Sequence, residues 1–142
     1  KTRDLLFELT VKEGDPDRIS NITGTLSGIA GSFDLSSQRI CGEAMNTSFP
    51  FARTNYKITA HTRLLGTTGL KQSLRIDLTF TDGSSQTIEN DLTDLLKNFN
   101  DDMPTPMYIT GDLLTPIEAD MTATIVGWGN GNEENGENIE IY

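Results

Sequence analysis

The sequence predicts an all-β protein, an antiparallel β-sandwich with one short helix. Apolar and polar residues alternate in about eight short runs, and this period of two is typical of strands with one face on a core. Clusters of Gly, Pro, Asp and Asn separate the runs, as turns between sandwich strands require. The 142 residues contain no long amphipathic helix, which a parallel α/β sheet would need between its strands.

Four strands are expected in the first half of the chain, at Leu5–Val11, Ile22–Phe33, Ala44–Phe51 and Tyr56–Leu64. A turn at residues 13–17 follows the first strand, because Gly14 and Pro16 supply turn geometry. Three glycines in the second strand disfavour a helix and indicate bulges or a close backbone approach. Residues 38–42 are expected to form a loop. Pro50 belongs at a sheet edge or strand end, since proline has no N–H for a ladder.

The clearest local pattern is a β-hairpin followed by a short helix. Leu74–Phe80 alternates strictly, Asp82-Gly83 allows the positive φ of a tight turn, and Gln86–Asn90 returns as the second strand. The apolar spacing then changes to a helical stripe about two turns long. This stripe consists of Leu92, Leu95, Leu96 and Phe99, and the helix is expected to dock by Leu92, Leu95 and Phe99. Asp91 is expected to cap the helix, and the carboxylate of Asp94 to meet the positive end of its dipole.

The last third of the chain predicts two more strands, at Met107–Gly111 and Met121–Gly127. Alternation places Trp128 on the polar face of the second of these strands. A tail rich in Gly, Asn and Glu then leads to the β-prone segment Ile139–Tyr142. This segment and the first strand, Leu5–Val11, are expected at sheet edges, where backbone groups are free to pair with another chain. No internal repeat is present.

Composition excludes several classes of protein. A chain of 142 residues is long enough to fold as one domain without a metal or a disulfide. The net charge of −10 repels phosphate backbones, so a nucleic acid is not an expected partner. The same acidic surface favours solubility, and metal binding or a cationic partner stays open. Nothing approaches the run of about 18 apolar residues that a membrane-spanning helix requires.

The residues that could carry chemistry are few. His61 is the single histidine and alternation places it on a polar strand face, so we expect a surface histidine. No second histidine or cysteine completes a common zinc set, and no G-x-S-x-G motif marks a nucleophile. Cys41, the single cysteine, has no internal disulfide partner and only Arg39 as a nearby cation. No catalytic residue is therefore predicted.

Other motifs have an ordinary and a functional interpretation. The acidic runs at residues 13–17, 101–102 and 130–138 are either solvated turns or calcium ligands, although none has EF-hand spacing. Asn21-Ile22-Thr23 and Asn46-Thr47-Ser48 fit the N-glycosylation triplet, which also occurs by chance in strands rich in Thr and Ser. Trp128 and Tyr142 either stack on sugars or belong to the core and its rim.

Four segments carry a family resemblance. Leu26–Ser32 resembles a strand of the form LSGMAGS, and Leu74–Gly83 resembles an alternating strand that ends in DG. Asp91–Leu95 resembles a DVTD motif followed by an apolar residue. Val126–Trp128 and Ile139–Ile141 resemble a closing VxxW and IEI pattern. In this order, the segments are similar to the fimbrial anchor and accessory lipoproteins of Bacteroides-type bacteria, which are related to type V fimbriae.

The resemblance implies that residues 1–142 form one β-sandwich, transthyretin-like or immunoglobulin-like, at the C-terminal end of a longer two-domain lipoprotein. The family is not enzymatic, so it implies no catalytic residue, cofactor or metal. It implies a structural or adhesive role at the cell surface, with a lipid anchor to the outer membrane outside this chain. The implied partners are other fimbrial subunits and the missing N-terminal domain, joined by strand pairing. A glycan-binding β-sandwich is the alternative, and no ligand-binding residues are predicted for it.

Overall fold

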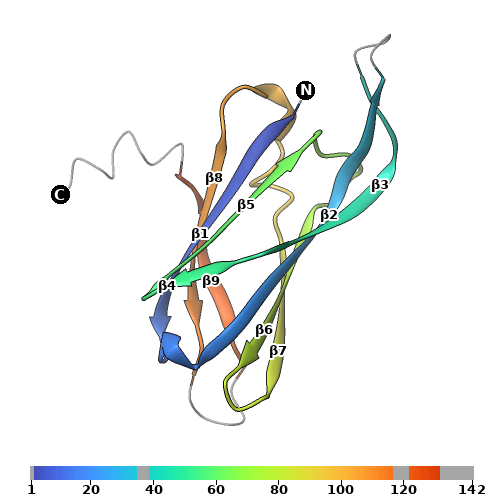
Figure 1. The fold of residues 1–142 in the computed structure, drawn as a ribbon. Coiled ribbons are helices and arrows are strands. Elements are labelled where there is room, and N and C mark those ends of the chain that lie inside the picture. The colour runs from blue at the N-terminus through green and yellow to red at the C-terminus, as the bar shows by residue number, and fades with distance from the viewer. Residues whose placement is uncertain (1, 35–38, 117–121, 132–142) are drawn as a thin grey trace, which may run out of the picture.

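The alternating segments form the strands of two facing sheets (Figure 1). The computed structural model describes residues 2–34, 39–116 and 122–131, with the backbone alone for residues 31–34 and 39–43. Sheet A has the strand order β4-β5-β1-β8-β9 and sheet B the order β3-β2-β6-β7. The strands are β1 (Arg3–Glu13), β2 (Ile19–Asp34), β3 (Arg39–Pro50), β4 (Ala52–Thr54), β5 (Lys57–Leu64), β6 (Ser73–Phe80), β7 (Ser85–Asp91), β8 (Met107–Leu114) and β9 (Thr124–Asn130). Two 3₁₀ turns, Pro16–Arg18 and Phe99–Asp101, complete the elements of the described chain.

The all-β sandwich is thus confirmed, while its assignment as transthyretin-like or immunoglobulin-like stays a prediction.

One strand pair departs from the expected antiparallel arrangement. β1 pairs with β5 in antiparallel orientation but with β8 in parallel orientation. β1 therefore lies inside sheet A, and the expectation that Leu5–Val11 forms an edge strand is wrong. The other expected edge segment, Ile139–Tyr142, lies outside the described residues.

Sheet B contains the expected hairpin and the expected glycine bulge. β6 and β7 pair in register across the turn at Asp82-Gly83, where Gly83 has a φ of 91°. In β2 the register shifts between Leu26 and Ile29, and Gly28 at this shift has a φ of 73°. An ideal Cβ at Gly28 would lie 2.1 Å from the carbonyl oxygen of Lys71, so a side chain has no room there.

The core lies between the sheets and is built from the inward residues of each alternating strand. Within it Phe7 and Phe49 stack and Phe51 lies tilted against both, with ring centroids 5.7 to 6.0 Å apart. The largest side chains that are almost completely buried are Phe7, Phe99, Leu5, Leu9, Leu26, Ile58, Leu74, Ile76, Leu78, Leu92, Leu96 and Ile109. Alternation predicted most of these inward positions, because a period of two fixes which face of a strand each residue occupies.

The expected helix over residues 92–99 does not form. Leu96 N donates to Leu92 O at 3.0 Å in one helical turn, and Phe99 N donates to Leu96 O in a 3₁₀ turn. The apolar stripe is nevertheless correct, since Leu92, Leu96 and Phe99 are buried and Leu95 packs against the core. A helix of this length is marginal in water, so contacts with the sandwich rather than helix propensity decide its backbone.

Two other expectations, for Cys41 and for Trp128, are wrong. Cys41 does not lie in a loop, because it belongs to β3 and pairs with Ser32 of β2. Trp128 does not lie on the polar face of β9. The register between β8 and β9 shifts beside Gly127, whose φ is 67°, and this bulge turns Trp128 toward the core. A bulge inserts one residue and so reverses the alternation that follows it.

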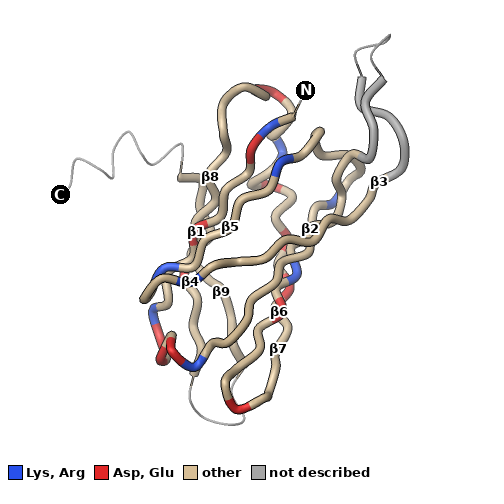
Figure 2. The backbone as a smooth tube through the Cα atoms, in the orientation of Figure 1, with Lys and Arg blue, Asp and Glu red and all other residues tan. Residues whose placement is uncertain are grey.

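Charge is unevenly distributed along the sheets. Figure 2 shows basic residues on β4 and β5, whereas acidic residues gather at the turn before β2. The sequence explains this difference, because the chain from Ala44 to Ile76 contains no Asp or Glu. No helix in the described ranges is long and apolar enough to cross a membrane.

Candidate functional site

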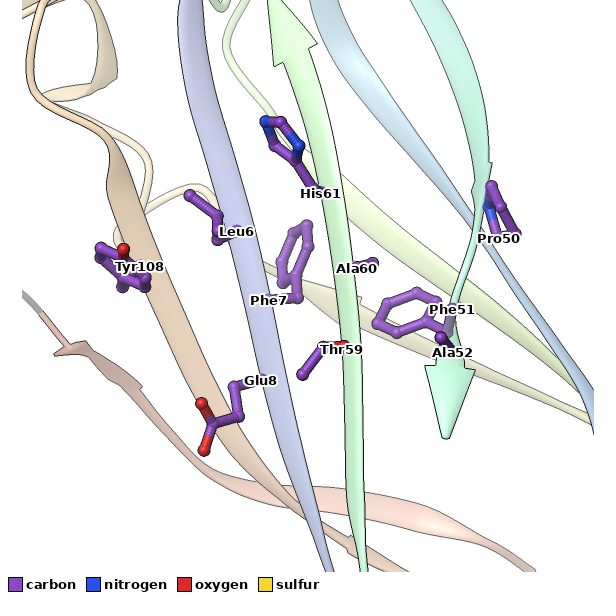
Figure 3. A pocket seen from close by; sticks show the side chains of 10 residues that line it. All are labelled: Leu6, Phe7, Glu8, Pro50, Phe51, Ala52, Thr59, Ala60, His61 and Tyr108. Atoms are coloured by element: carbon purple, nitrogen blue, oxygen red, sulfur yellow. The ribbon is translucent and has the colours of Figure 1, made fainter. Parts of the chain in front are cut away.

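A shallow, mainly apolar hollow lies where outward side chains of sheet A meet the end of β3 and the start of β4 (Figure 3). Its volume is about 390 Å³. Residues of β1, β5 and β8 line it, together with the segment that joins β3 to β4: Leu6, Phe7, Glu8, Pro50, Phe51, Ala52, Thr59, Ala60, His61 and Tyr108. The strand registers place Leu6 directly between His61 of β5 and Tyr108 of β8. The outward side chains of three neighbouring strands therefore meet there.

His61 stands at the rim of this hollow and bonds to a carboxylate. Its Nε2 lies 3.1 Å from Asp4 Oδ1, and the Arg63 Nε donates to the same oxygen at 2.9 Å. The hydrogen bond from His61, and next that from Arg63, holds the pKa of the Asp4 carboxyl below its usual value. His61 is 53% exposed, as its place on a polar strand face predicted. His61 and Arg63 thus share one carboxylate in contact with water.

A second ion pair lies on the same face, where Lys57 Nζ donates to Glu8 Oε2 at 2.8 Å and to Thr10 Oγ1 at 3.1 Å. This pair and the Asp4 cluster occupy neighbouring strands without a nucleophile between them. Among the described residues, no group of three or more His, Cys, Asp or Glu side chains is arranged to hold a metal ion. The arrangement can position charged groups on a partner surface.

The acidic turns have local structural contacts. Asp15 Oδ1 accepts from Asp17 N at 2.9 Å, and Asp17 pairs with Arg53 of β4 at 3.2 Å. Asp101 and Asp102 are exposed and line the same surface hollow as Arg3. The acidic tail lies mostly beyond residue 131, outside the described residues.

The remaining sequence candidates are dispersed. Asn21 and Asn46 are both exposed, on β2 and β3. Trp128 is half-buried against the core, as the rim interpretation predicted, and within the described chain its Nε1 has no hydrogen-bond partner. Tyr142 lies outside the described residues. The structure therefore does not bring the sequence candidates together at one place.

The two exposed tyrosines of the described chain lie toward opposite ends of β1. Tyr56 is 57% exposed and lies beside the end of β1, whereas Tyr108 is 42% exposed and lies beside its beginning. Ring contacts within the core join the buried Phe7, Phe49 and Phe51. A glycan site of the kind expected for the alternative function needs neighbouring exposed rings.

Sequence reasoning missed two features. The first is Arg3, a buried cation 5% exposed, whose guanidinium donates to carbonyl oxygens of residues 98–105. The second is the short β4, which pairs with only the first three residues of β5. The proline at position 50 was a signal for the second feature, since it ends β3 just before the chain crosses from sheet B to sheet A.

Taken as a class, this is a two-sheet β-sandwich whose described surface carries shallow hollows and open strand edges. No family model matches the chain, and no curated protein is significantly similar to it. Solved structures do share its fold. One is a Bacteroides ovatus protein provisionally named an adhesin, with a TM-score of 0.59, 13% identity and a match over 85% of this chain.

Two further structures match over 91% of this chain. A Bacteroides fragilis protein provisionally named a cell adhesion protein has a TM-score of 0.57 and 17% identity. The fimbrial anchor protein Mfa2 from Porphyromonas gingivalis has a TM-score of 0.59 and 15% identity. This chain spans about half of each neighbour, namely 49%, 45% and 46% of their lengths. At these identities the likeness establishes a shared fold.

Proposed function

We propose that this chain is a non-enzymatic domain of a cell-surface adhesin or fimbrial subunit. The observation that carries the proposal is the match of 85–91% of the chain to three solved structures, whose names all refer to adhesion or to a fimbrial anchor. The outer face of sheet A agrees with this role, because it presents ion pairs and a shallow hollow without a catalytic set.

In its finer form, the proposal makes this chain the C-terminal domain of an outer-membrane lipoprotein that carries its lipid anchor elsewhere. The domain joins other fimbrial subunits, or its own N-terminal domain, by pairing strands. Two facts support this form. The chain spans about half of each structural neighbour, and β-sandwiches end in edge strands with free backbone groups.

The test is genetic and is made in the native host. The gene is deleted and restored either complete or without Ile139–Tyr142, and electron microscopy scores the number, length and attachment of the fimbriae. We expect short, few or detached fimbriae in the deletion strain and rescue by the complete gene. Normal, firmly attached fimbriae in the deletion strain would refute the fimbrial role. Full rescue by the shortened gene would remove only the last segment from the mechanism.

A further inference from the structure

The edge of β5 is covered along only part of its length. β4 pairs with Lys57, Ile58 and Thr59, and the register ends there. β5 continues to Leu64, with β1 as its neighbour on the other side. Within the described chain, residues Ala60–Leu64 therefore have no strand partner on the β4 side. We call this stretch the open edge.

The strand register shows which backbone groups face the open edge. Val11 N donates to Tyr56 O at 2.9 Å, and this contact continues the register in which Ala60 lies opposite Phe7. In an antiparallel ladder, every second residue directs both its N–H and its C=O toward the same neighbour. Tyr56, Ile58, Ala60, Thr62 and Leu64 therefore bond to β1. His61 and Arg63 direct their backbone groups toward the open edge.

The chain leaves this edge uncovered for a local reason. Pro50 has no N–H to donate, and Phe51 N donates to Ile22 O of sheet B at 2.9 Å. The segment just before β4 is therefore held by the other sheet and does not extend along β5. Figure 1 shows β3 and β5 close together near β4 and farther apart toward the end of β5.

A hollow of about 250 Å³ lies between the sheets at this side of the sandwich. β2 and β3 line it on one side and the end of β5 on the other, through Ile29, Ala30, Met45, Asn46, Thr47, Arg63, Leu64 and Leu65. Met45 is 54% exposed, so it presents an apolar side chain beside this hollow. A strand added along β5 would turn every second side chain toward this hollow.

The outward side of the open edge is basic. Arg63 is 64% exposed and His61 is 53% exposed, and both bond to the single carboxylate of Asp4. From Ala44 to Ile76 the chain has five basic residues and no acidic one, although the whole chain has a net charge of −10. Outward side chains of an added strand would lie directly opposite His61 and Arg63. Acidic side chains fit there, and basic ones are repelled.

We propose that the open edge of β5 receives an extended segment of another polypeptide in antiparallel orientation, with apolar and acidic side chains in alternation. The apolar side chains enter the hollow beside Met45, and the acidic ones lie opposite His61 and Arg63. This inference rests on the proposed adhesive or fimbrial role and deepens it, because it names the acceptor strand and the chemistry of the segment that binds.

The first measurement is amide hydrogen exchange in the full chain. The amides of His61 and Arg63 should exchange quickly in the free protein, and those of Ala60 and Thr62 slowly. A synthetic peptide, Thr-Ile-Glu-Ile-Glu-Ile-Thr, should then protect the amides of His61 and Arg63. Protection of both amides in the free protein would show that the chain fills this edge itself, and would overturn the proposal.

The second measurement uses backbone-modified peptides. In an antiparallel pair, the residues opposite His61 and Arg63 direct their own N–H groups to β5. N-methylation of the two glutamates should therefore abolish binding, whereas N-methylation of the first and last isoleucines should leave it. Equal binding of both methylated peptides would show contact without strand pairing, and the reverse preference would exclude the antiparallel register.

The third measurement tests charge with a matched control. Replacing Glu by Lys in the peptide should weaken binding about tenfold or more. Arg63→Ala should weaken binding of the Glu peptide about threefold to tenfold. Arg75→Ala should leave it unchanged, because Arg75 is similarly exposed and paired with Asp77 but lies on sheet B. Equal effects of the two substitutions would refute the basic edge as the acceptor.

These measurements are independent of the genetic test. If no peptide binds and the deletion strain still loses its fimbriae, only the acceptor edge is wrong. If the peptide binds in the predicted register and the deletion strain is normal, the edge is an acceptor and the fimbrial role is wrong.

Discussion

Arg3 should be the most sensitive polar residue of this fold. Its Nη1 donates to Phe99 O at 2.6 Å, its Nε donates to Thr105 O, and its guanidinium lies 5.2 Å from the centre of the Phe99 ring. These contacts join β1 to the segment of turns that replaces the expected helix. We expect Arg3→Met to release that segment, since methionine fills similar apolar space without a donor.

The expected loss in free energy of unfolding follows from the hydrogen bonds of Arg3 that the substitution removes. A hydrogen bond from a charged donor contributes about 1.5–3 kcal/mol, so two give about 3–6 kcal/mol. The third contact, to Asn98 O at 3.4 Å, is too long to add much. Because methionine keeps part of the packing on Phe99, we expect a net loss near the lower end, about 3–4 kcal/mol.

Urea unfolding followed by circular dichroism measures this loss from the midpoint and the slope. Arg75→Met is the matched control, because Arg75 is 55% exposed and pairs with half-buried Asp77 on the sheet surface, so its loss should be about 0–1 kcal/mol. Arg3→Lys should fall between the two, since it keeps the charge but not the planar fork. Equal midpoints for Arg3→Met and Arg75→Met would refute the importance of the buried guanidinium.

Three further predictions concern the turns. Leu96→Ala should lower the free energy of unfolding by about 2–5 kcal/mol because Leu96 is fully buried, and Leu95→Ala should lower it clearly less because Leu95 is partly exposed. Equal urea midpoints for the two variants would show that the segment packs differently. Gly28→Ala should lower the free energy of unfolding by about 3 kcal/mol or more, and Gly83→Ala by about 1 kcal/mol. Both glycines have positive φ, but of the two only Gly28 lacks space for a side chain. A smaller loss at Gly28 than at Gly83 would contradict this reasoning. Hydrogen bonds from Thr93 lower the pKa of the Asp91 carboxyl from its ordinary value of 3.8. The ionised carboxylate therefore stabilises the fold above pH 3.8, and this stabilisation is lost as the pH falls through the lower pKa of the folded state. Asp91→Asn should therefore lessen the fall in urea midpoint below about pH 4, and an unchanged fall would exclude Asp91 as a source of acid sensitivity.

Strand positions were largely predictable because alternation is a local property of the chain. The hairpin of β6 and β7 needs only its own residues and the Asp82-Gly83 turn. The errors arise where tertiary contacts decide. Residues 92–99 have helical spacing but adopt turns held by Arg3, which is almost a hundred positions away. Trp128 changes face through one bulged residue, and no polarity pattern marks that bulge.

Strand order was not predictable, because it depends on contacts between distant segments. β1 lies between β5 and β8, and its parallel pairing with β8 links residues about a hundred positions apart. An alternating strand at the start of a chain has the same pattern at an edge as inside a sheet, provided that one face is exposed. The outer face of sheet A is exposed, so the outward residues of β1, such as Leu6, Glu8 and Thr10, have the pattern of an edge strand. They therefore do not reveal that β5 and β8 pair with β1 on both sides.

The proposed acceptor edge consists of backbone groups, and this explains why no residue motif revealed it. Any side chain can stand on a strand whose N–H and C=O groups are free, so the site has no required residue type. What the sequence does contain is indirect: a proline that ends β3, and a basic stretch in an acidic chain. Charged side chains on an edge strand also prevent indiscriminate pairing between identical edges, since like charges repel. At β5 the same Arg63 and His61 that repel a second basic edge would attract an acidic segment. The edge is therefore protected from self-association by the feature that selects its partner.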